Sequence, residues 1–449
     1  MFVNKNIFCN APWHEIHIWH NGDYGYCCQR YDKPYDENFR VGQKPNDIPN
    51  PFNIKKMGIK EWYDSEPMRK SRLEFLGQQR PSACNGCWSS EDHGSSSKRT
   101  RSNQRSVIFQ ENFEDSLLQS PDFKHFKQAH DNNGQYGELP VDLHIDLGNY
   151  CNLSCKMCYP QGSTKIATQY KKWNILEDES LLGANWTADK ETWNKFLDDV
   201  AELPRISSIH FMGGETLIQK QFLEFIDFMI DRGRVDYRIS FVTNGTTFDQ
   251  KLIDKLSKFE AVGIEISIET VDRSNEYIRQ GTVNETVLDN IDRYLNLKHD
   301  NISFIVRPTL SLLSIRDFHG LLRYCLKKKL LIKSLVLQAP VSQRIDVLPL
   351  EIRQGMIKPY QDLLEELDDL KFDHVDINEN DGANYQEMVK RHAELAIELL
   401  RKDDHARQKE LLGECVNWMD RWDKVQNLNA LEIYSELSDI LKKGGYGQL

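Results

Sequence analysis

Residues 148–159 read G-N-Y-C-N-L-S-C-K-M-C-Y and place three cysteines, Cys151, Cys155 and Cys158, in one short loop. The loop follows V-D-L-H-I-D-L at 141–147, whose alternating apolar residues predict a β-strand. Thiolates at this spacing are suited to one iron–sulfur cluster or one metal ion. Because a closed site takes four protein ligands, three ligands predict a position left open to a substrate or cofactor.

Downstream of this loop, short apolar runs alternate with longer helical patterns. Strand–helix alternation predicts βαβ units with right-handed crossovers and a parallel sheet. Six units predict a partial (β/α)6 barrel with its ligands at the carboxyl ends of the strands. The predicted strands are 141–147, 206–212, 237–243, 262–268, 302–309 and 334–339, and the predicted helices between them are 189–203, 219–233, 249–258, 284–298 and 316–328.

Composition divides the chain into four segments. Residues 1–105 are rich in Cys, Trp, Pro and Gly, which predicts a small Cys-rich α+β domain that needs more than an apolar core to hold it. Residues 106–139 are interpreted as a connector, 140–345 as the partial barrel of parallel strands, and 346–449 as a helical C-terminal region. The predicted fold class is therefore α/β.

Length, charge and cysteine count restrict the function. The 449 residues carry a net charge of −11, which argues against a nucleic-acid partner. The chain has no apolar stretch of ~20 residues and no signal-peptide pattern, so we expect a cytoplasmic protein without a membrane partner. Thiols stay reduced in that compartment, so seven of the ten cysteines, which fall into two groups with ligand-like spacing, indicate metal binding. The basic run with Lys98, Arg99, Arg101 and Arg105 is interpreted as a solvated loop, with an anionic-ligand patch as the alternative.

A second cysteine group lies near the N-terminus, where Cys9 and Cys27 precede Cys84 and Cys87 of A-C-N-G-C-W. Cys28 adjoins Cys27, and because successive strand residues face opposite ways, only one of the two should face a metal. Four thiols fit an iron–sulfur cluster or a zinc ion. The histidines of this segment are not expected to be ligands; they are His14, His17 and His20.

These patterns together resemble the radical S-adenosylmethionine (SAM) superfamily, whose three-cysteine loop follows the first barrel strand. In the order typical of the family, the second strand ends in G-G-E, the third ends in T-N-G, and the fourth carries S-I-E. The resemblance implies a [4Fe–4S] cluster on the loop and SAM at its open iron. It implies reductive cleavage of SAM to a 5′-deoxyadenosyl radical that abstracts hydrogen from a substrate. The SAM-binding residues implied are Tyr159, Gly213, Gly214, Glu215, Thr243, Asn244, Ser267, Glu269 and Arg279.

The resemblance also implies a role for several of these residues. The glycines of G-G-E let the backbone approach the SAM amino group, and Arg279 pairs with the SAM carboxylate. Ser267 and Glu269 are similar to the polar pair that contacts the ribose. Met157 stands where the family often has an aromatic residue, so Tyr159 shares the adenine contact. No catalytic side chain is assigned.

The N-terminal spacing C-x12-G-x4-C with a distant C-x2-C resembles the twitch domain, the shorter relative of the SPASM domain. It implies that Cys9, Cys27, Cys84 and Cys87 hold an auxiliary [4Fe–4S] cluster, which would accept or conduct electrons. A zinc site with the same four thiols is the alternative. Here the twitch segment precedes the barrel.

The resemblance leaves the substrate open. We expect a peptide or protein substrate, with a sugar, aminocyclitol or nucleotide as the alternative small molecule. A non-catalytic metal-binding scaffold is a third hypothesis. An enzyme of this kind also implies an external one-electron donor such as flavodoxin or ferredoxin.

Overall fold

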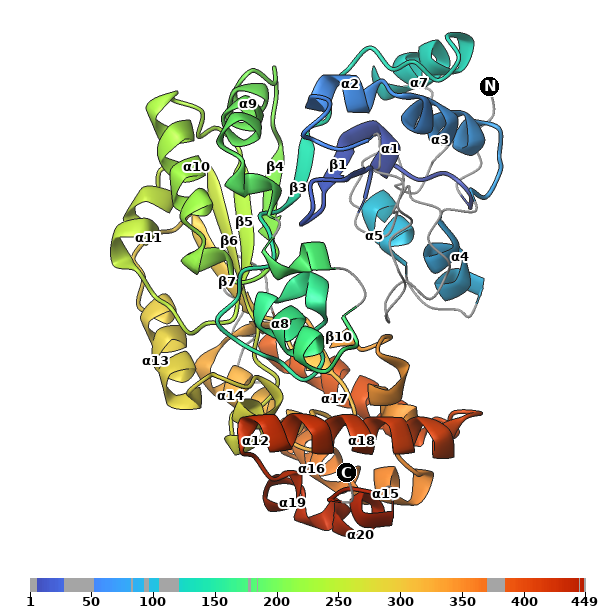
Figure 1. The fold of residues 1–449 in the computed structure, drawn as a ribbon, viewed down its shortest axis with the longest axis vertical. Helices are drawn as coiled ribbons and strands as arrows, with labels where there is room; N and C mark the ends of the chain where they lie inside the picture. Colours follow the sequence, from blue (N-terminus) through green and yellow to red (C-terminus); the bar gives the residue numbers. More distant parts are fainter. Residues whose placement is uncertain are drawn as a thin grey trace. The chain divides into compact units, whose positions relative to one another are not determined.

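The computed structural model describes residues 6–27, 52–81, 84–92, 97–104, 121–176, 179–183, 185–369, 384–443 and 445–447. These residues form two compact units, and Figure 1 colours them along the chain. The first unit comprises 1–150, 160–241 and 250–262, and the second comprises 151–159, 242–249 and 263–449.

The main sheet has the strand order β2-β1-β3-β4-β5-β6-β7-β9. Its strands are β1 Glu15–Ile18, β2 Tyr24–Gly25, β3 Asp142–Asp146, β4 Ser208–Met212, β5 Arg238–Thr243, β6 Ala261–Ile266, β7 Ile302–Val306 and β9 Leu331–Ile332. Strands β1 and β2 are antiparallel, whereas β1–β3, β3–β4, β4–β5 and β7–β9 are parallel. The predicted α/β class with a mostly parallel sheet is confirmed.

The sixth predicted strand, 334–339, is wrong as a member of this sheet. Its residues form β10 (Leu335–Val336), which pairs with β8 (Thr309–Leu310) in a separate two-stranded sheet. Pro308 separates β7 from β8, and proline has no N–H to give to a sheet ladder. The place beside β7 is taken by β9 instead.

Helices follow most strands, as the alternating pattern predicts. Those of the first unit are α1 Ala11–His14, α2 Ile59–Tyr63, α3 Glu66–Leu76, α4 Asn85–Asp92, α5 Lys98–Gln104, α7 Pro121–Asp131, α8 Thr164–Lys172, α9 Lys190–Ala201, α10 Lys220–Asp231 and α11 Gln250–Leu256. Those of the second unit are α12 Arg273–Ile278, α13 Asn284–Leu295, α14 Phe318–Lys328, α15 Leu350–Gly355, α16 Lys358–Asp369, α17 Tyr385–Arg401, α18 Gln408–Gln426, α19 Ala430–Ile433 and α20 Ser438–Lys443.

In the first unit, α9 and α10 cover one face of β4 (Figure 1). The ring of Phe211 on β4 meets Phe225 of α10 at 4.9 Å between centroids, and Phe196 of α9 packs against Phe225 at 6.3 Å. Because strand side chains alternate, burying Ile209 and Phe211 under the helices turns His210 to the opposite face of the sheet. That opposite face is the one available for polar chemistry.

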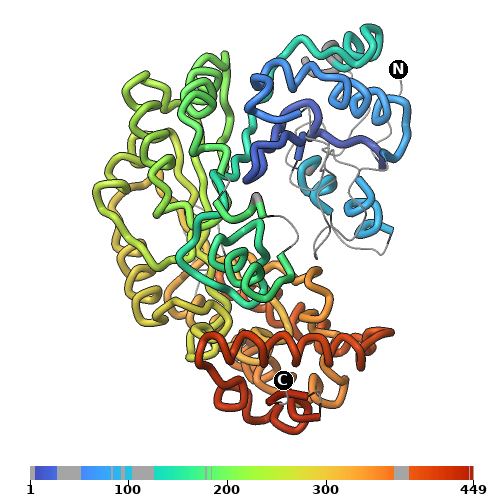
Figure 2. The backbone as a smooth tube through the Cα atoms, in the orientation of Figure 1, coloured from blue at the N-terminus to red at the C-terminus, as the bar shows by residue number. Residues whose placement is uncertain are grey.

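In the second unit, helices α15 to α20 gather in the orange-to-red part of the chain (Figure 2). Buried Arg353 of α15 donates hydrogen bonds to the carbonyls of Leu400 and Lys402, at 3.0 and 2.6 Å. These carbonyls end α17, where the helix itself supplies no partner. None of the helices in the described residues combines the length and apolar character needed to cross a bilayer.

Candidate functional site

The loop after β3 brings three thiols together in the second unit. Cys151, Cys155 and Cys158 are partly buried and form no disulfide with one another. Burial raises the pKa of Cys155, Arg279 opposes this, and the charges of Cys158 and Cys151 raise the pKa further. The N–H of Leu153 points at Cys151 Sγ at 3.4 Å. Cys155 thus lies near both other thiols, and three thiols on one loop with a backbone donor are a suitable ligand set for an iron–sulfur cluster.

Arg279 lies against this loop, with its Nη1 3.8 Å from Cys155 Sγ. Its other guanidinium nitrogens pair with the fully buried carboxylate of Glu269, Nη2 lying 2.7 Å from Oε1. Burial lowers the pKa of Arg279, but the charge and hydrogen bond of Glu269 together with the charges of Cys155 and Cys158 outweigh it, and the net pKa is raised. The same Glu269 Oε1 also accepts from the N–H of Thr309 at 3.2 Å. Glu269 therefore holds Arg279, a contact that the sequence analysis did not anticipate.

The T-N-G segment at the end of β5 also meets the cysteine loop within the second unit. Asn244 Nδ2 donates to Oδ1 of Asn152, the residue after Cys151, at 2.8 Å. Thr243 is buried, and its carbonyl accepts from the N–H of Ser267 at 2.8 Å. The second unit thus brings these predicted residues to strand ends near the thiols. Tyr159 is 52% exposed.

The G-G-E segment lies in the first unit, at the end of β4. Gly213 and Gly214 both have positive φ, 91° and 57°, which side-chain-bearing residues rarely adopt. The N–H of Glu215 donates to the carbonyl of Tyr150 at 2.9 Å, so this turn packs on the residue that precedes Cys151. Glu215 is buried, and its Oε1 accepts from the N–H of Leu217 at 3.1 Å.

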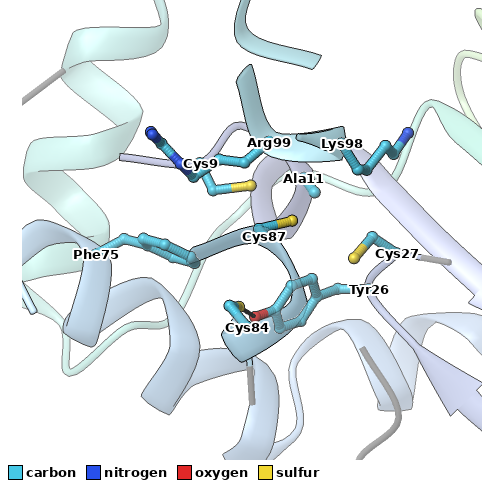
Figure 3. Close-up of a pocket in the computed structure, with 9 residues that line it drawn as sticks. All are labelled: Cys9, Ala11, Tyr26, Cys27, Phe75, Cys84, Cys87, Lys98 and Arg99. Carbon is cyan, nitrogen blue, oxygen red and sulfur yellow. Dashed lines mark hydrogen bonds between the residues drawn. The ribbon is translucent and has the colours of Figure 1, made fainter. Parts of the chain in front are cut away.

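The four N-terminal cysteines line one pocket of the first unit (Figure 3). Cys9 precedes α1, Cys27 follows β2, and Cys84 and Cys87 lie at the start of α4. All four are buried and form no disulfide with one another. Burial raises the pKa of Cys9, and the charges of Cys84 and Cys87 add to this effect. Tyr26 Oη lies 2.9 Å from Cys84 Sγ. The alternative ligand, Cys28, lies outside the described residues.

The basic run predicted as a solvated loop is instead helix α5, and Lys98 and Arg99 line the cysteine pocket. Arg99 is 5% exposed, its guanidinium lies 4.8 Å from the ring centre of Trp88, and its Nε donates to Glu91 at 3.0 Å. The sequence analysis counted the charges of this run but had no signal for these partners. A buried cation beside four thiols favours their deprotonated, metal-binding form.

Lys156, inside the three-cysteine loop, is a residue that the sequence analysis missed. Its side chain is fully buried, and its Nζ lies 2.9 Å from Asp423 Oδ1 of α18 and 4.5 Å from the ring centre of Tyr277. Burial lowers the pKa of Lys156, and Asp423 opposes this effect. The Asp423 carboxylate also accepts from the hydroxyls of Tyr277 and Tyr446, at 3.1 and 2.7 Å. This ion pair links the three-cysteine loop to α18 across a sequence separation of 267 residues.

Comparison with known proteins finds one protein family whose model matches part of this chain. The family model described as "Radical SAM superfamily" matches residues 145–325. These residues match a radical SAM domain. Members of the superfamily are enzymes that bind a [4Fe–4S] cluster and SAM, so the predicted cofactors of this domain are confirmed.

Individual relatives of the radical SAM domain are distant. An S-adenosylmethionine-dependent nucleotide dehydratase of Selenomonas ruminantium is 26% identical over 129 residues, 28% of this chain and 38% of that protein. The sporulation killing factor maturation protein SkfB of Bacillus subtilis is 23% identical over 177 residues, 38% of this chain and 36% of that protein. The chain spans about a third of the length of the curated relatives it matches.

A solved structure described as native anSMEcpe with bound AdoMet is also similar. It is 17% identical, with a TM-score of 0.36, and the match covers 51% of this chain and 62% of that one.

The residues of the radical SAM domain fit its cofactors. Cys151, Cys155 and Cys158 would hold the cluster, and the strand-end residues of the same unit, Thr243, Asn244 and Ser267, would contact SAM. When bound and reduced, this pair of cofactors supplies a 5′-deoxyadenosyl radical. The protein positions the cofactors and excludes water. Buried Glu269 contributes by fixing the direction of Arg279.

Proposed function

We propose that this chain is a radical SAM enzyme that abstracts hydrogen from its substrate, with Cys151, Cys155 and Cys158 as the cluster ligands. The approach of Arg279 to Cys155, at 3.8 Å, supports this proposal most directly. An arginine beside three thiols is suited to neutralise thiolate charge and to pair with the carboxylate of SAM. Glu269 consequently becomes a positioning residue for Arg279, and we no longer propose that it contacts the ribose.

Formation of 5′-deoxyadenosine tests this proposal. We expect the anaerobically reconstituted protein to release 5′-deoxyadenosine from SAM after reduction with dithionite, as measured by liquid chromatography. A variant with Cys155→Ala should lose this activity because an open cubane needs all three thiols. The matched control is Cys325→Ala, which removes a buried thiol outside both cysteine groups. Equal release by the Cys155 variant and the wild type would reject the proposal.

We further propose that Cys9, Cys27, Cys84 and Cys87 hold an auxiliary [4Fe–4S] cluster. Four buried thiols around one pocket would close every corner of a cubane, so its role is to accept or conduct an electron. Arg99 at the pocket supports a negatively charged occupant. Zinc, the alternative, carries no electron.

Removing two of these thiols distinguishes an auxiliary iron–sulfur cluster from a zinc site. We expect a Cys84→Ala/Cys87→Ala variant to lose about four iron atoms per chain, to keep SAM cleavage, and to lose net substrate oxidation. Cys415→Ala, which removes a buried thiol of α18, is the control. The measurements are iron and zinc per chain, 5′-deoxyadenosine, and oxidised product. Loss of about one zinc atom with no change in iron would identify the zinc site instead.

The substrate we propose is a peptide or protein. The similarity to a protein named for the maturation of the sporulation killing factor supports this choice. A nucleotide-sized molecule is the second candidate, because another relative is named as a nucleotide dehydratase. Flavodoxin or ferredoxin would supply the electron. Substrate-dependent acceleration of 5′-deoxyadenosine release, measured with peptide and nucleotide libraries, would discriminate between the two classes.

A further inference from the structure

Three histidines stand side by side on one face of the main sheet. His17 of β1 is in register with His144 of β3, which is in register with His210 of β4. The opposite face at neighbouring positions carries Ile145 and Ile209, which are fully buried. The histidines therefore lie on the face opposite the apolar layer formed by these isoleucines.

Two of these histidines converge on the carboxylate that ends β3. Nε2 of His17 lies 3.3 Å from Oδ1 of Asp146, and Nε2 of His144 lies 3.7 Å from the same oxygen. All three candidate ligand atoms lie within 4.8 Å of one another. Metal–ligand bonds of about 2.0–2.2 Å place two ligands of one tetrahedral zinc roughly 3.4 Å apart. The two distances to Asp146, 3.3 and 3.7 Å, are close to that spacing.

His17 and Asp146 carry buried polar atoms that make no hydrogen bond with the described residues. His17 is 2% exposed, yet neither of its ring nitrogens has a hydrogen-bond partner among the residues that the structure describes. Oδ1 of Asp146 also lacks one, because its 3.3 Å approach to His17 does not have hydrogen-bond geometry. Buried side-chain nitrogens and oxygens are satisfied in most proteins, so such atoms facing one another indicate a missing ligand.

The neighbouring side chains hold the two rings in place. The ring of His17 stacks between Trp19 and His144, with centroid distances of 4.0 and 4.1 Å. Sδ of Met212 lies 3.0 Å from Nε2 of His144, which places a soft thioether at the edge of the group. Trp186 donates to the backbone carbonyl of Asp146 at 2.9 Å and so steadies the end of β3.

We propose that His17, His144 and Asp146 bind one divalent first-row transition-metal ion, in a site separate from both cysteine groups. Two imidazoles and one carboxylate are a ligand set for Zn²⁺ or Fe²⁺ that leaves coordination positions open. A substrate oxygen or water can occupy those positions, so the ion would polarise a bound carbonyl or carboxylate. The proposal concerns metal binding alone and stands whether or not SAM is cleaved.

Zinc binding to the cluster-loaded protein tests this site. After treatment with EDTA and gel filtration, the wild type should bind about one zinc ion per chain by mass spectrometry of the metal. Asp146→Asn and His17→Gln should weaken binding at least 10- to 100-fold. Anomalous scattering at the zinc edge should place the ion between these residues.

The matched control is His210→Gln, which changes the next histidine of the same row. Nδ1 of His210 already has a partner, because it lies 2.8 Å from Oγ of Ser240. The His210→Gln variant should therefore leave zinc binding unchanged. If Asp146→Asn does not fold, His144→Gln replaces it, with cluster absorbance as the check on folding. Wild-type protein without zinc, zinc on the cysteines only, or unchanged affinity in the variants would each overturn the proposal.

Discussion

Replacing Asp423 with alanine is expected to lower the free energy of unfolding by about 3–5 kcal/mol. The change leaves the ammonium of Lys156 fully buried without its counter-charge, because its Nζ lies 2.9 Å from Asp423. It also removes the acceptor of two buried or half-buried tyrosine hydroxyls and of the N–H of Ala430. Denaturation of the anaerobic protein, followed by circular dichroism, measures the loss.

Two further variants make this result specific to the buried pair. Asp420→Ala, one turn earlier on α18, also removes a buried carboxylate, but its partner Lys424 is 46% exposed and stays solvated without it, so we expect a smaller loss than for Asp423→Ala. Replacing both charges, Lys156→Met with Asp423→Leu, should recover part of the loss, because no uncompensated charge remains. A stability of Asp423→Ala within about 0.5 kcal/mol of the wild type would contradict the argument.

The same variant has a functional consequence. Lys156 follows Cys155 directly, and its carbonyl accepts from Nε2 of Gln343 at 2.9 Å, so both its side chain and its backbone are held. Releasing the side chain should loosen the cysteine loop. We therefore expect Asp423→Ala to bind less iron per chain than Asp420→Ala when both are reconstituted at a temperature where they remain folded.

The parts of the fold that the sequence predicts are those encoded by local pattern. The strands β3 to β7 and the helices between them follow from apolar alternation and helical spacing, and the thiols of the loop after β3 follow from their spacing in the sequence. The predicted strand 334–339 failed because strand propensity does not say which neighbour a strand pairs with, and Pro308 interrupts the run before it.

Contacts between distant positions explain what the sequence analysis missed at the sites. Nothing near Lys156 indicates a carboxylate on α18, and nothing near Glu269 shows that its carboxylate would hold Arg279 rather than face a ligand. The sequence analysis did not expect His17 to be a ligand. Its partners, His144 and Asp146, come from a strand more than 120 residues away that pairs with β1.

Replacing Gly214 with alanine is expected to abolish SAM binding and to destabilise the first unit. At φ +57° a side chain costs about 1–2 kcal/mol. The added Cβ would also lie 2.6 Å from the carbonyl carbon and 2.9 Å from the nitrogen of Tyr150, and overpacking typically costs a further ~1–3 kcal/mol. Because these are backbone atoms, relief requires moving the residue before Cys151. Calorimetry of SAM binding and thermal unfolding measure the two effects.

Gly233→Ala measures the energetic cost of the backbone conformation without the steric clash. Gly233 has φ +66°, close to that of Gly214, but no atom lies within 4 Å of the Cβ that alanine would add. It should therefore show only the conformational cost of about 1–2 kcal/mol and bind SAM like the wild type. The additional loss in Gly214→Ala then reports the contact between the G-G-E turn and Tyr150, through which β4 is connected to the cysteine loop. If Gly214→Ala bound SAM as tightly as Gly233→Ala, that contact would have no part in forming the SAM site.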